Sequence, residues 1–270
     1  MNWNNKTVLI TGGGSGIGRE IAKQLYEKGA TLIVVSLVEL ELDSLHQELN
    51  SEKDRLITIT IDLTKANAID ELLEKINEKK VQIDVLINNA GTALYGEHIS
   101  LDTTRINTML TLNILVLTEL CTKVANQMIA NNIKGQILNI ASIGAFTPMP
   151  NLAAYTASKS YVLSFSHALK EELAPKGIFV GTYCPGITKT PIFQAMGLEL
   201  DNKNKNSVSY ISQKFAMSVE STAKLAIESI EKKHVVSLPK LNKVMPIYGI
   251  LPNRLKAWIA QQTVKSRAAK

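Results

Sequence analysis

Short runs of apolar residues alternate along the chain with longer segments in which apolar residues recur every three or four positions. The apolar runs, which predict strands, cover residues 7–11, 31–36, 56–63, 85–91, 135–142, 178–186 and 235–239. The amphipathic segments, which predict helices, cover residues 18–29, 39–50, 67–79 and 103–131 and a segment around residue 155. Because the strands are apolar throughout, both of their faces are expected to be buried. The alternation predicts an α/β fold, a doubly wound parallel sheet with helices on both faces.

The chain divides into one domain and a tail. Residues 1–240 form one predicted domain, because no internal repeat or low-complexity linker interrupts them. Residues 191–218 are the most loop-like part of it, and apolar side chains such as Ile192, Met196 and Phe215 predict a lid over a cleft for a lipophilic substrate. Residues 241–270 are a basic tail: nine lysines and arginines but no acidic residue follow Glu231, so the net charge of +6 belongs to this end.

Within the tail, a predicted helix over residues 248–264 places Leu251, Leu255, Trp258 and Ile259 on one stripe, with Lys256 and other basic residues elsewhere. A basic amphipathic helix can lie on an anionic membrane surface, which would make the protein peripheral to a membrane. The favoured alternative is that the stripe packs on the domain or on a neighbouring subunit. No face combining aromatic and basic residues accompanies the charge, so no nucleic-acid partner is expected.

The composition excludes several other classes. Cys121 and Cys184 lie in apolar runs and are too few for a disulfide framework, so we expect reduced thiols in a cytoplasmic protein. The N-terminal residues lack a signal-peptide pattern, and no run approaches about 18 apolar residues, so no membrane-spanning helix is expected. Cysteines and histidines are not clustered at ligand spacing, so no metal site is expected.

A glycine-rich turn joins the first predicted strand to the first predicted helix. Gly12, Gly16 and Gly18 give the spacing G-x-x-x-G-x-G. Residues without a Cβ allow unusual backbone angles and a close approach of the backbone to a ligand. The helix that begins near Gly16 directs unsatisfied N–H groups and the positive end of its dipole at that point. The turn therefore predicts a phosphate-binding site.

Two other glycine-rich motifs do not match the sequence. The G-x-G-x-x-G spacing is absent. The nucleotide-triphosphatase pattern G-x-x-x-x-G-K-[ST] is nearly met from Gly13 to Gly18, but Arg19 and Glu20 replace its lysine and its hydroxyl. Glu20 would repel both a phosphate and the ligands of Mg²⁺, so a triphosphatase is not expected.

Tyr155 and Lys159 stand at i and i+4, so a helix places them on one face. Such a pair is either a proton-transfer site or two polar residues that a helix happens to carry, and the spacing alone does not decide between them. A free tyrosine has a pKa of about 10, and an ammonium about 4 Å away contributes about 4 kcal/mol, enough to lower that pKa by about 3 units. A lysine at this spacing could therefore acidify Tyr155 for general acid/base catalysis, the role that the resemblance described next implies for it, with Ser142 hydrogen-bonded to the same substrate oxygen.

Seven features occur in a fixed order over residues 5–192. They are TGGGSGIG at 11–18, Asp62 after the third strand, NNAG at 88–91, Asn113 in the long helix, Ser142, the Y-x-x-x-K pair Tyr155 and Lys159, and PG-x-x-x-T at 185–190. Together they resemble the short-chain dehydrogenase/reductase family. The resemblance implies a Rossmann-type fold, a nicotinamide cofactor, hydride transfer between that cofactor and an alcohol or carbonyl carbon, and a homodimer or homotetramer.

The resemblance also implies roles for individual residues. Lys159 would hold the nicotinamide ribose, and Asn113 would support a water chain that resupplies protons. The expected cofactor contacts are Gly12, Ser15, Gly16, Ile17 and Gly18 at the pyrophosphate and nearby ribose, Asp62 and Leu63 at the adenine, Asn88 at the adjacent ribose, Ala90 and Gly91 through the backbone, and Pro185, Gly186, Thr188 and Thr190 at the nicotinamide.

The choice of nicotinamide departs from the family's rule. In the family, an Asp at the end of the second strand selects NAD, and a basic residue one step later or in the glycine turn selects NADP. Here Ser36 and Leu37 occupy those places, and the turn offers Ser15. With no carboxylate to repel a phosphate and Ser36 able to hydrogen-bond one, the sequence favours NADP(H) over NAD(H).

The sequence thus predicts an NAD(P)-dependent oxidoreductase acting on a lipophilic alcohol or carbonyl compound. The alternative is a non-catalytic dinucleotide-binding regulator or interaction protein of the same fold, because a fold does not fix a function. The Ser142, Tyr155 and Lys159 set argues against that alternative, because a regulator needs no proton path.

Overall fold

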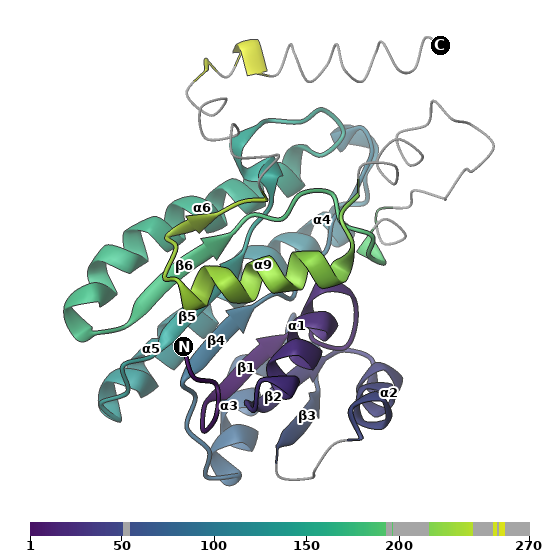
Figure 1. Cartoon of the computed structure of the whole chain (residues 1–270). Coiled ribbons are helices and arrows are strands. Elements are labelled where there is room, and N and C mark those ends of the chain that lie inside the picture. The colour runs from purple at the N-terminus through teal and green to yellow at the C-terminus, as the bar shows by residue number, and fades with distance from the viewer. Residues whose placement is uncertain (51–54, 193–195, 197–215, 240–250, 253, 257–270) are drawn as a thin grey trace.

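The computed structural model describes residues 1–50, 55–192, 196, 216–239, 251–252 and 254–256. Its centre is a seven-stranded parallel sheet with the order β3-β2-β1-β4-β5-β6-β7 (Figure 1). The strands are β1 Thr7–Thr11, β2 Thr31–Ser36, β3 Leu56–Thr60, β4 Val85–Asn88, β5 Gln136–Ile140, β6 Phe179–Tyr183 and β7 Val236–Ser237. The strand order reverses between β1 and β4, which is where ligands bind in open α/β sheets. The predicted Rossmann-type, doubly wound sheet is confirmed.

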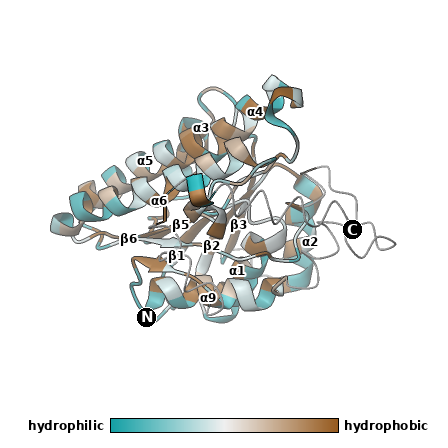
Figure 2. Cartoon of the chain, turned by 90° about the horizontal axis from the view of Figure 1, so that it is seen from above, coloured by the Kyte–Doolittle hydropathy of each residue, from teal (hydrophilic) through white to brown (hydrophobic). Residues whose placement is uncertain are grey.

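Helices cover both faces of the sheet (Figure 2). One layer consists of α1 Gly16–Glu27, α2 Glu39–Leu49 and α9 Val219–Glu231. The other consists of α3 Ala68–Glu78, α4 Thr103–Leu110, α5 Leu117–Ala130 and α6 Ala153–Leu173. Side chains of β1 alternate between the two buried clusters: Leu9 joins the one that contains Leu72 and Leu120, whereas Ile10 joins the one that contains Ile21 and Ile227. The apolar strands are thus buried on both faces, as their composition predicts.

Four predicted elements differ from the structure in its described residues, and one helix was not predicted. The strand runs predicted at 56–63, 85–91 and 178–186 end earlier, at Thr60, Asn88 and Tyr183, and the residues that follow β4 and β6 contribute loops to the candidate site. The single helix predicted over 103–131 is α4, a π-helical segment η2 Thr111–Val116, and α5. Helix α9 was not predicted, although the Ser218 hydroxyl caps its start by accepting a hydrogen bond from the Ser221 N–H.

The stretch Thr103–Ala130 is the one helical segment in the described residues that is long and apolar enough to cross a membrane, with a mean hydropathy of 1.4. The sequence analysis expected none. Length and composition are the only criteria it meets. Leu120, Cys121 and Val124 are fully buried and belong to the cluster on one face of the sheet. Its apolar residues therefore serve the core of the domain.

Candidate active site

The glycine turn is built against the loop that follows β4. Gly12 and Gly16 have φ of +62° and +54°, a region that L side chains rarely adopt. A Cβ on Gly12 would lie 2.8 Å from Ala90 Cα. The Asn89 amide donates to the carbonyl oxygens of Thr11 and Gly12 at 3.1 and 2.9 Å. The sequence analysis did not single out Thr11 or Asn89, although Asn89 is part of the NNAG motif.

A cavity of about 280 Å³ opens at this turn, and we call it the glycine-turn cavity. It gathers residues from the glycine turn, the loops after β4, β5 and β6, and helix α6. Its lining is Gly12, Ser15, Gly16, Ile17, Asn89, Ala90, Gly91, Ile140, Ala141, Tyr155, Lys159, Pro185, Thr190, Pro191 and Ile192. Most of the predicted cofactor contacts are therefore brought together.

A second cavity, of about 240 Å³, adjoins the first, and we call it the apolar cavity. Apolar side chains dominate its walls. Its lining is Ile17, Tyr95, Ser142, Ile143, Gly144, Met149, Leu152, Tyr155, Pro185, Gly186, Ile187, Thr188, Thr190, Ile192 and Met196. Because Tyr155 lines both cavities, its side chain stands at the boundary between them.

Burial controls the ionisation of Tyr155 and Lys159. Burial raises the pKa of Tyr155, and a hydrogen bond with the Ser142 hydroxyl partly opposes this. Burial lowers the pKa of Lys159 from 10.5 to about 8, and its amine donates to the Ile140 carbonyl at 3.0 Å. The expectation that Lys159 lowers the pKa of Tyr155 is not met here, because desolvation is the largest influence on the phenol.

Ser142 lies at the end of β5 and begins a short 3₁₀ helix, η3 Ile143–Phe146. Its hydroxyl oxygen accepts a hydrogen bond from the Gly144 N–H at 3.1 Å. Together with the Tyr155 hydroxyl, it supplies polar groups to one wall of the otherwise apolar cavity. Ser142 and Tyr155 thus lie side by side on this wall, as hydrogen bonding to one substrate oxygen would require.

Asn113 is buried in the π-helical segment η2 and ties the loop after β4 to α6. Its amide donates to the Thr92 carbonyl and to the Ser158 hydroxyl, both at 3.0 Å, and its oxygen accepts from the Thr92 N–H. A Cβ on Gly91 would lie 3.1 Å from Asn113 Oδ1 and 3.4 Å from Lys159 Nζ. Asn113 and Lys159 thus meet beside Gly91. A π-bulge at such a position is frequent at functional sites.

Two of the predicted nicotinamide contacts also fasten the loop after β6. The Thr188 hydroxyl donates to the Gly186 carbonyl at 3.1 Å and shares a hydrogen bond with the Thr222 hydroxyl of α9 at 3.2 Å. The Thr190 hydroxyl donates to the Thr188 carbonyl at a long 3.5 Å and lines both cavities. The unpredicted helix α9 therefore helps to position this loop.

The side chain of Asn88 does not face either cavity, contrary to the prediction. Its amide donates to Asn139 Oδ1 at 2.9 Å and to Cys121 Sγ at 3.2 Å, within the core. The physical reason is the pleat of β4, which directs successive side chains to opposite faces. Asn88 thus points toward α5, whereas Asn89 reaches the glycine turn.

Asp62 and Leu63 are not brought to the glycine-turn cavity either. The Leu63 side chain is 6% exposed and packs in the core. The Asp62 carboxylate accepts hydrogen bonds from the N–H and hydroxyl of Thr64, at 3.0 and 2.6 Å, which hold the pKa of Asp62 below its usual value. Asp62 and Leu63 follow β3, which lies two strands away from β1. A ligand would therefore have to extend beyond the described cavities to contact them.

The end of β2 holds a carboxylate that the sequence analysis did not foresee. The Ser36 hydroxyl donates to Glu41 Oε2 at 2.8 Å. The premise that no carboxylate lies at this place is therefore wrong. No motif marks Glu41, because it reaches Ser36 from the first turn of α2.

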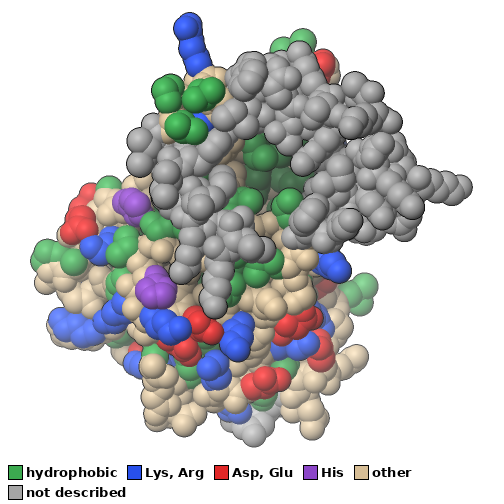
Figure 3. Space-filling model, turned by 45° about the horizontal axis from the view of Figure 1, so that its top comes forward, with side chains coloured by type: hydrophobic (Ala, Val, Ile, Leu, Met, Phe, Trp, Pro, Cys, Tyr) green, Lys and Arg blue, Asp and Glu red, His purple; other side chains and the backbone are tan. Residues whose placement is uncertain are grey.

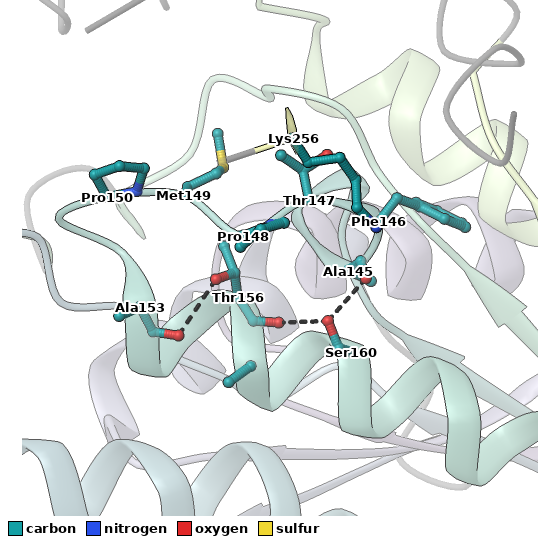
Figure 4. Close-up of a pocket in the computed structure, with 11 residues that line it drawn as sticks. Ala145, Phe146, Thr147, Pro148, Met149, Pro150, Ala153, Thr156, Ser160 and Lys256 are labelled. Atoms are coloured by element: carbon teal, nitrogen blue, oxygen red, sulfur yellow. Dashed lines mark hydrogen bonds between the residues drawn. The ribbon is translucent and has the colours of Figure 1, made fainter. Parts of the chain in front are cut away.

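A third cavity, of about 510 Å³, shares Met149 with the apolar cavity (Figure 4). The 145–150 loop, the start of α6 and Lys256 line it, and the Ser160 hydroxyl below it bonds to the Ala145 and Thr156 carbonyls. Lys256 is 7% exposed and Leu255 41%, the reverse of the predicted stripe, because a lysine can bury its methylene stem. Trp258 and Ile259, and most of the predicted lid, lie outside the described residues.

Known proteins share this fold and these motifs. A family model described as short chain dehydrogenase matches residues 6–201. The probable oxidoreductase EphD of Mycobacterium tuberculosis is 25% identical over 260 residues, which are 93% of this chain and 44% of that protein. The chain thus spans less than half the length of the first curated relatives that it matches.

Solved structures show the same similarity. A short-chain dehydrogenase from Sphingobium yanoikuyae in complex with NADPH is 28% identical, with a TM-score of 0.77 over 98% of this chain and 94% of that chain. The bulky-bulky ketone specific alcohol dehydrogenase from Comamonas testosteroni is 28% identical, with a TM-score of 0.75 over 97% and 94%. A 3-ketoacyl-(acyl-carrier-protein) reductase from Brucella melitensis complexed with NADH is 25% identical, with a TM-score of 0.74 over 87% and 96%.

Because the family model covers more than half of the sequence, this chain belongs to the short-chain dehydrogenase family. The relatives and solved structures named above are oxidoreductases, dehydrogenases or reductases by their names. The neighbours bound to NADPH or NADH support a nicotinamide dinucleotide as its cofactor. The alternative of a non-catalytic regulator is not favoured.

Proposed function

We propose that this enzyme transfers a hydride between a nicotinamide dinucleotide and the alcohol or carbonyl carbon of a lipophilic substrate, with Tyr155 as the general acid/base. The observation that carries the proposal is the position of Tyr155 at the boundary between the glycine-turn cavity and the apolar cavity. A group at that boundary can exchange a proton with a substrate in one cavity while the other is occupied by a cofactor.

The glycine-turn cavity fits a dinucleotide. Three glycines leave its floor free of side chains, and a Cβ on Gly18 would overlap the Gly12 carbonyl and the Asn89 amide. The Ser15 hydroxyl makes no capping bond at the start of α1, so it is free to meet a phosphate together with the N–H groups of that helix. A bound nicotinamide would supply or accept the hydride. Residues 12–18 would hold its pyrophosphate, with Lys159 at the nicotinamide ribose and Thr190 at the nicotinamide.

Tyr155 would move the proton. With its pKa raised by burial, the phenol is protonated at neutral pH, so in the reductive direction it can donate to the carbonyl oxygen as the carbon is reduced. Ser142 would hydrogen-bond that oxygen and hold it in line. Lys159 and Asn113 meet beside Gly91, directly below the cavity, and we assign them to ribose binding and to a route by which solvent returns the proton to Tyr155.

The apolar cavity supports a lipophilic substrate. Ile143, Met149, Leu152, Ile187 and Met196 line it, and its only described hydroxyl groups are those of Ser142, Tyr95, Tyr155, Thr188 and Thr190. Such a wall binds apolar groups of a ligand because their surface is removed from water on binding. The few polar groups of the cavity then orient the ligand. The similarity to a ketone-specific alcohol dehydrogenase supports the same class of substrate.

The preference for NADP(H) that the sequence favours stays a prediction. That preference was argued from the sequence at the end of β2, which has neither a carboxylate to repel a 2′-phosphate nor a cation to bind one. Glu41 supplies such a carboxylate in the structure. Its consequence for the choice of cofactor is argued below.

Assembly and location are also proposals. We propose a single catalytic domain over residues 1–240, with residues 191–218 as a lid and 241–270 as the tail, in a cytoplasmic homodimer or homotetramer. The burial of Lys256 against the domain supports packing of the tail over peripheral membrane contact. Lys and Arg are interspersed with Asp and Glu on the described part of the face seen in Figure 3. We propose no nucleic-acid partner. Light scattering of the purified protein measures the number of subunits.

The experiment that tests the function follows NADH and NADPH absorbance at 340 nm with a panel of carbonyl compounds graded from small and polar to bulky and apolar. We expect turnover, with kcat/KM rising as apolar groups are added to the ketone. If a dinucleotide binds tightly and no carbonyl or alcohol is turned over, the proposed reaction is wrong. Equal kcat/KM for polar and apolar ketones of one size would contradict the lipophilic substrate.

A further inference from the structure

We propose that Glu41 sets the choice between the two nicotinamide dinucleotides and that it favours NAD(H) over NADP(H). The inference rests on the proposed function, because it concerns the adenosine end of the same cofactor. It reverses the preference that the sequence alone favours.

The end of β2 is fastened to the glycine turn. The Gly13 N–H donates to the Val35 carbonyl at 3.0 Å, and Thr11 of β1 pairs with Val35 of β2. In dinucleotide-binding folds of this type, an acidic residue about 20 residues after the glycine turn hydrogen-bonds the 2′-hydroxyl of the adenosine ribose. Ser36 holds that place in this chain, and it has no charge of its own.

Glu41 supplies the missing carboxylate from a different element. It lies in the first turn of α2, and its Oε2 accepts the Ser36 hydroxyl at 2.8 Å. The Val38 N–H donates to Ser36 Oγ at 3.2 Å, which fixes the serine. A Cβ on Gly14 would overlap Glu41 Oε2 and would lie 2.6 Å from Ser36 Oγ. The carboxylate therefore lies directly against the glycine turn, where the 2′ position of the ribose is expected.

Neighbouring cations do not neutralise this carboxylate. Within the described residues, the Glu41 side chain makes no ion pair. Arg19 uses four of the five guanidinium donors on other oxygens: two go to Glu48 Oε2, one to the Gly14 carbonyl and one to the backbone carbonyl of Glu41. Lys23 pairs with Glu48 and Glu20.

These contacts predict opposite responses to the two cofactors. A ribose diol can donate hydrogen bonds to Glu41, and hydrogen bonds to a charged group are the stronger kind. A 2′-phosphate in the same place would face a like charge, and Arg19 would have only one guanidinium donor left for it, because the other four are engaged. We expect NADH to bind at least about tenfold more tightly than NADPH, a ratio that corresponds to about 1.4 kcal/mol.

The test measures the dissociation constants of NADH and NADPH by nucleotide fluorescence for the wild type and for Glu41→Gln. Competition by AMP and by adenosine 2′,5′-bisphosphate isolates the adenosine end. We expect Glu41→Gln to narrow the NADH/NADPH ratio at least about tenfold, chiefly by tightening NADPH and the bisphosphate. Glu39→Gln, an exposed carboxylate on the same helix, is the matched control and should leave the ratio unchanged. Glu41→Ala is the second variant if Glu41→Gln melts at a lower temperature than the wild type.

Three results would overturn the inference. One is tighter binding of NADPH than of NADH by the wild type, lost in Arg19→Gln, which would mean that Arg19 leaves Glu48 to take the phosphate. Another is an equal change in Glu41→Gln and Glu39→Gln, which would mean a general effect of charge. Binding of neither dinucleotide would remove the proposed function itself, whereas the first two results leave that function intact.

Discussion

The two ends of the proposed cofactor site, on either side of the glycine turn, differ in how they are built. At the reaction end, Tyr155 and Lys159 come from one helix, and burial dominates their ionisation. At the adenosine end, the charged groups Arg19, Glu41 and Glu48 come from two helices and are partly exposed. The proposed chemistry thus depends on a short motif in one helix, whereas the proposed choice of cofactor depends on a side chain that no motif marks.

The largest expected effect tests the reaction end. Tyr155→Phe removes the phenolic proton, so kcat should fall by about 10²–10⁴-fold, the usual contribution of general acid–base catalysis. The dissociation constant of the dinucleotide should change little, because the ring is retained. Tyr161→Phe is the matched control: it lies on the same helix, and its hydroxyl bonds to Thr118 away from both cavities. A Tyr155→Phe enzyme as fast as Tyr161→Phe would refute the assigned role.

The next largest effect tests the glycine turn, which lies between the two ends of the proposed cofactor site. A Cβ at Gly18 would overlap the Gly12 carbonyl and the Asn89 amide, both of which are held in place. Overpacking of this kind costs about 1–3 kcal/mol, so Gly18→Ala should lower the free energy of unfolding and weaken dinucleotide binding together. Gly135→Ala would overlap the flexible end of Met128 instead, away from the cavities, and should affect stability alone. Equal dinucleotide affinity in Gly18→Ala and Gly135→Ala would contradict the phosphate site.

A smaller effect concerns the buried amine. Burial lowers the pKa of Lys159 to about 8, from 10.5, so the charged amine destabilises the folded chain fully below pH 8 and progressively less as the pH rises to 10.5. Lys159→Met removes that cost of at most about 3 kcal/mol, but it also removes a hydrogen bond to the Ile140 carbonyl, so we expect a net gain of about 1–2 kcal/mol at pH 7.

Thermal unfolding at pH 7 and pH 10 measures this effect. The stability gained in Lys159→Met should shrink or vanish at pH 10, whereas Lys170→Met, on the exposed side of α6, should show no such dependence. A variant that is less stable than the wild type at pH 7 would mean that the amine is stabilised by contacts stronger than its desolvation.

The smallest expected effect concerns the adenosine end, where it tests the contribution of the Ser36 hydroxyl to the choice of cofactor. Ser36→Ala removes the hydroxyl that bonds to Glu41 but keeps the carboxylate. Loss of one such hydrogen bond is worth about 0.5–1.5 kcal/mol, so the NADH/NADPH ratio should change by only a few-fold, less than in Glu41→Gln. Titrations of both cofactors measure it. A larger change in Ser36→Ala than in Glu41→Gln would place the discrimination in the serine rather than in the carboxylate.

The amino-acid sequence was sufficient to predict the features that depend on residues close together in the chain. The period of apolar residues predicts the strands and most of the helices, because burial of one helix face or both strand faces is a local constraint. Helical spacing alone places Tyr155 and Lys159 together. Helix α9 was missed even though its Ser218 cap is visible in the sequence, which is a failure to use a signal that was present.

The tertiary structure decided what depends on neighbours distant in sequence. Which face of β4 receives Asn88 is set by the elements packed on both sides of the sheet, and they turn its amide toward Cys121. Burial, not the nearby amine, governs the pKa of Tyr155. Glu41 contacts Gly14 only because α2 returns beside the glycine turn. The electrostatic interaction at a binding site depends on distance in space rather than on position in the chain.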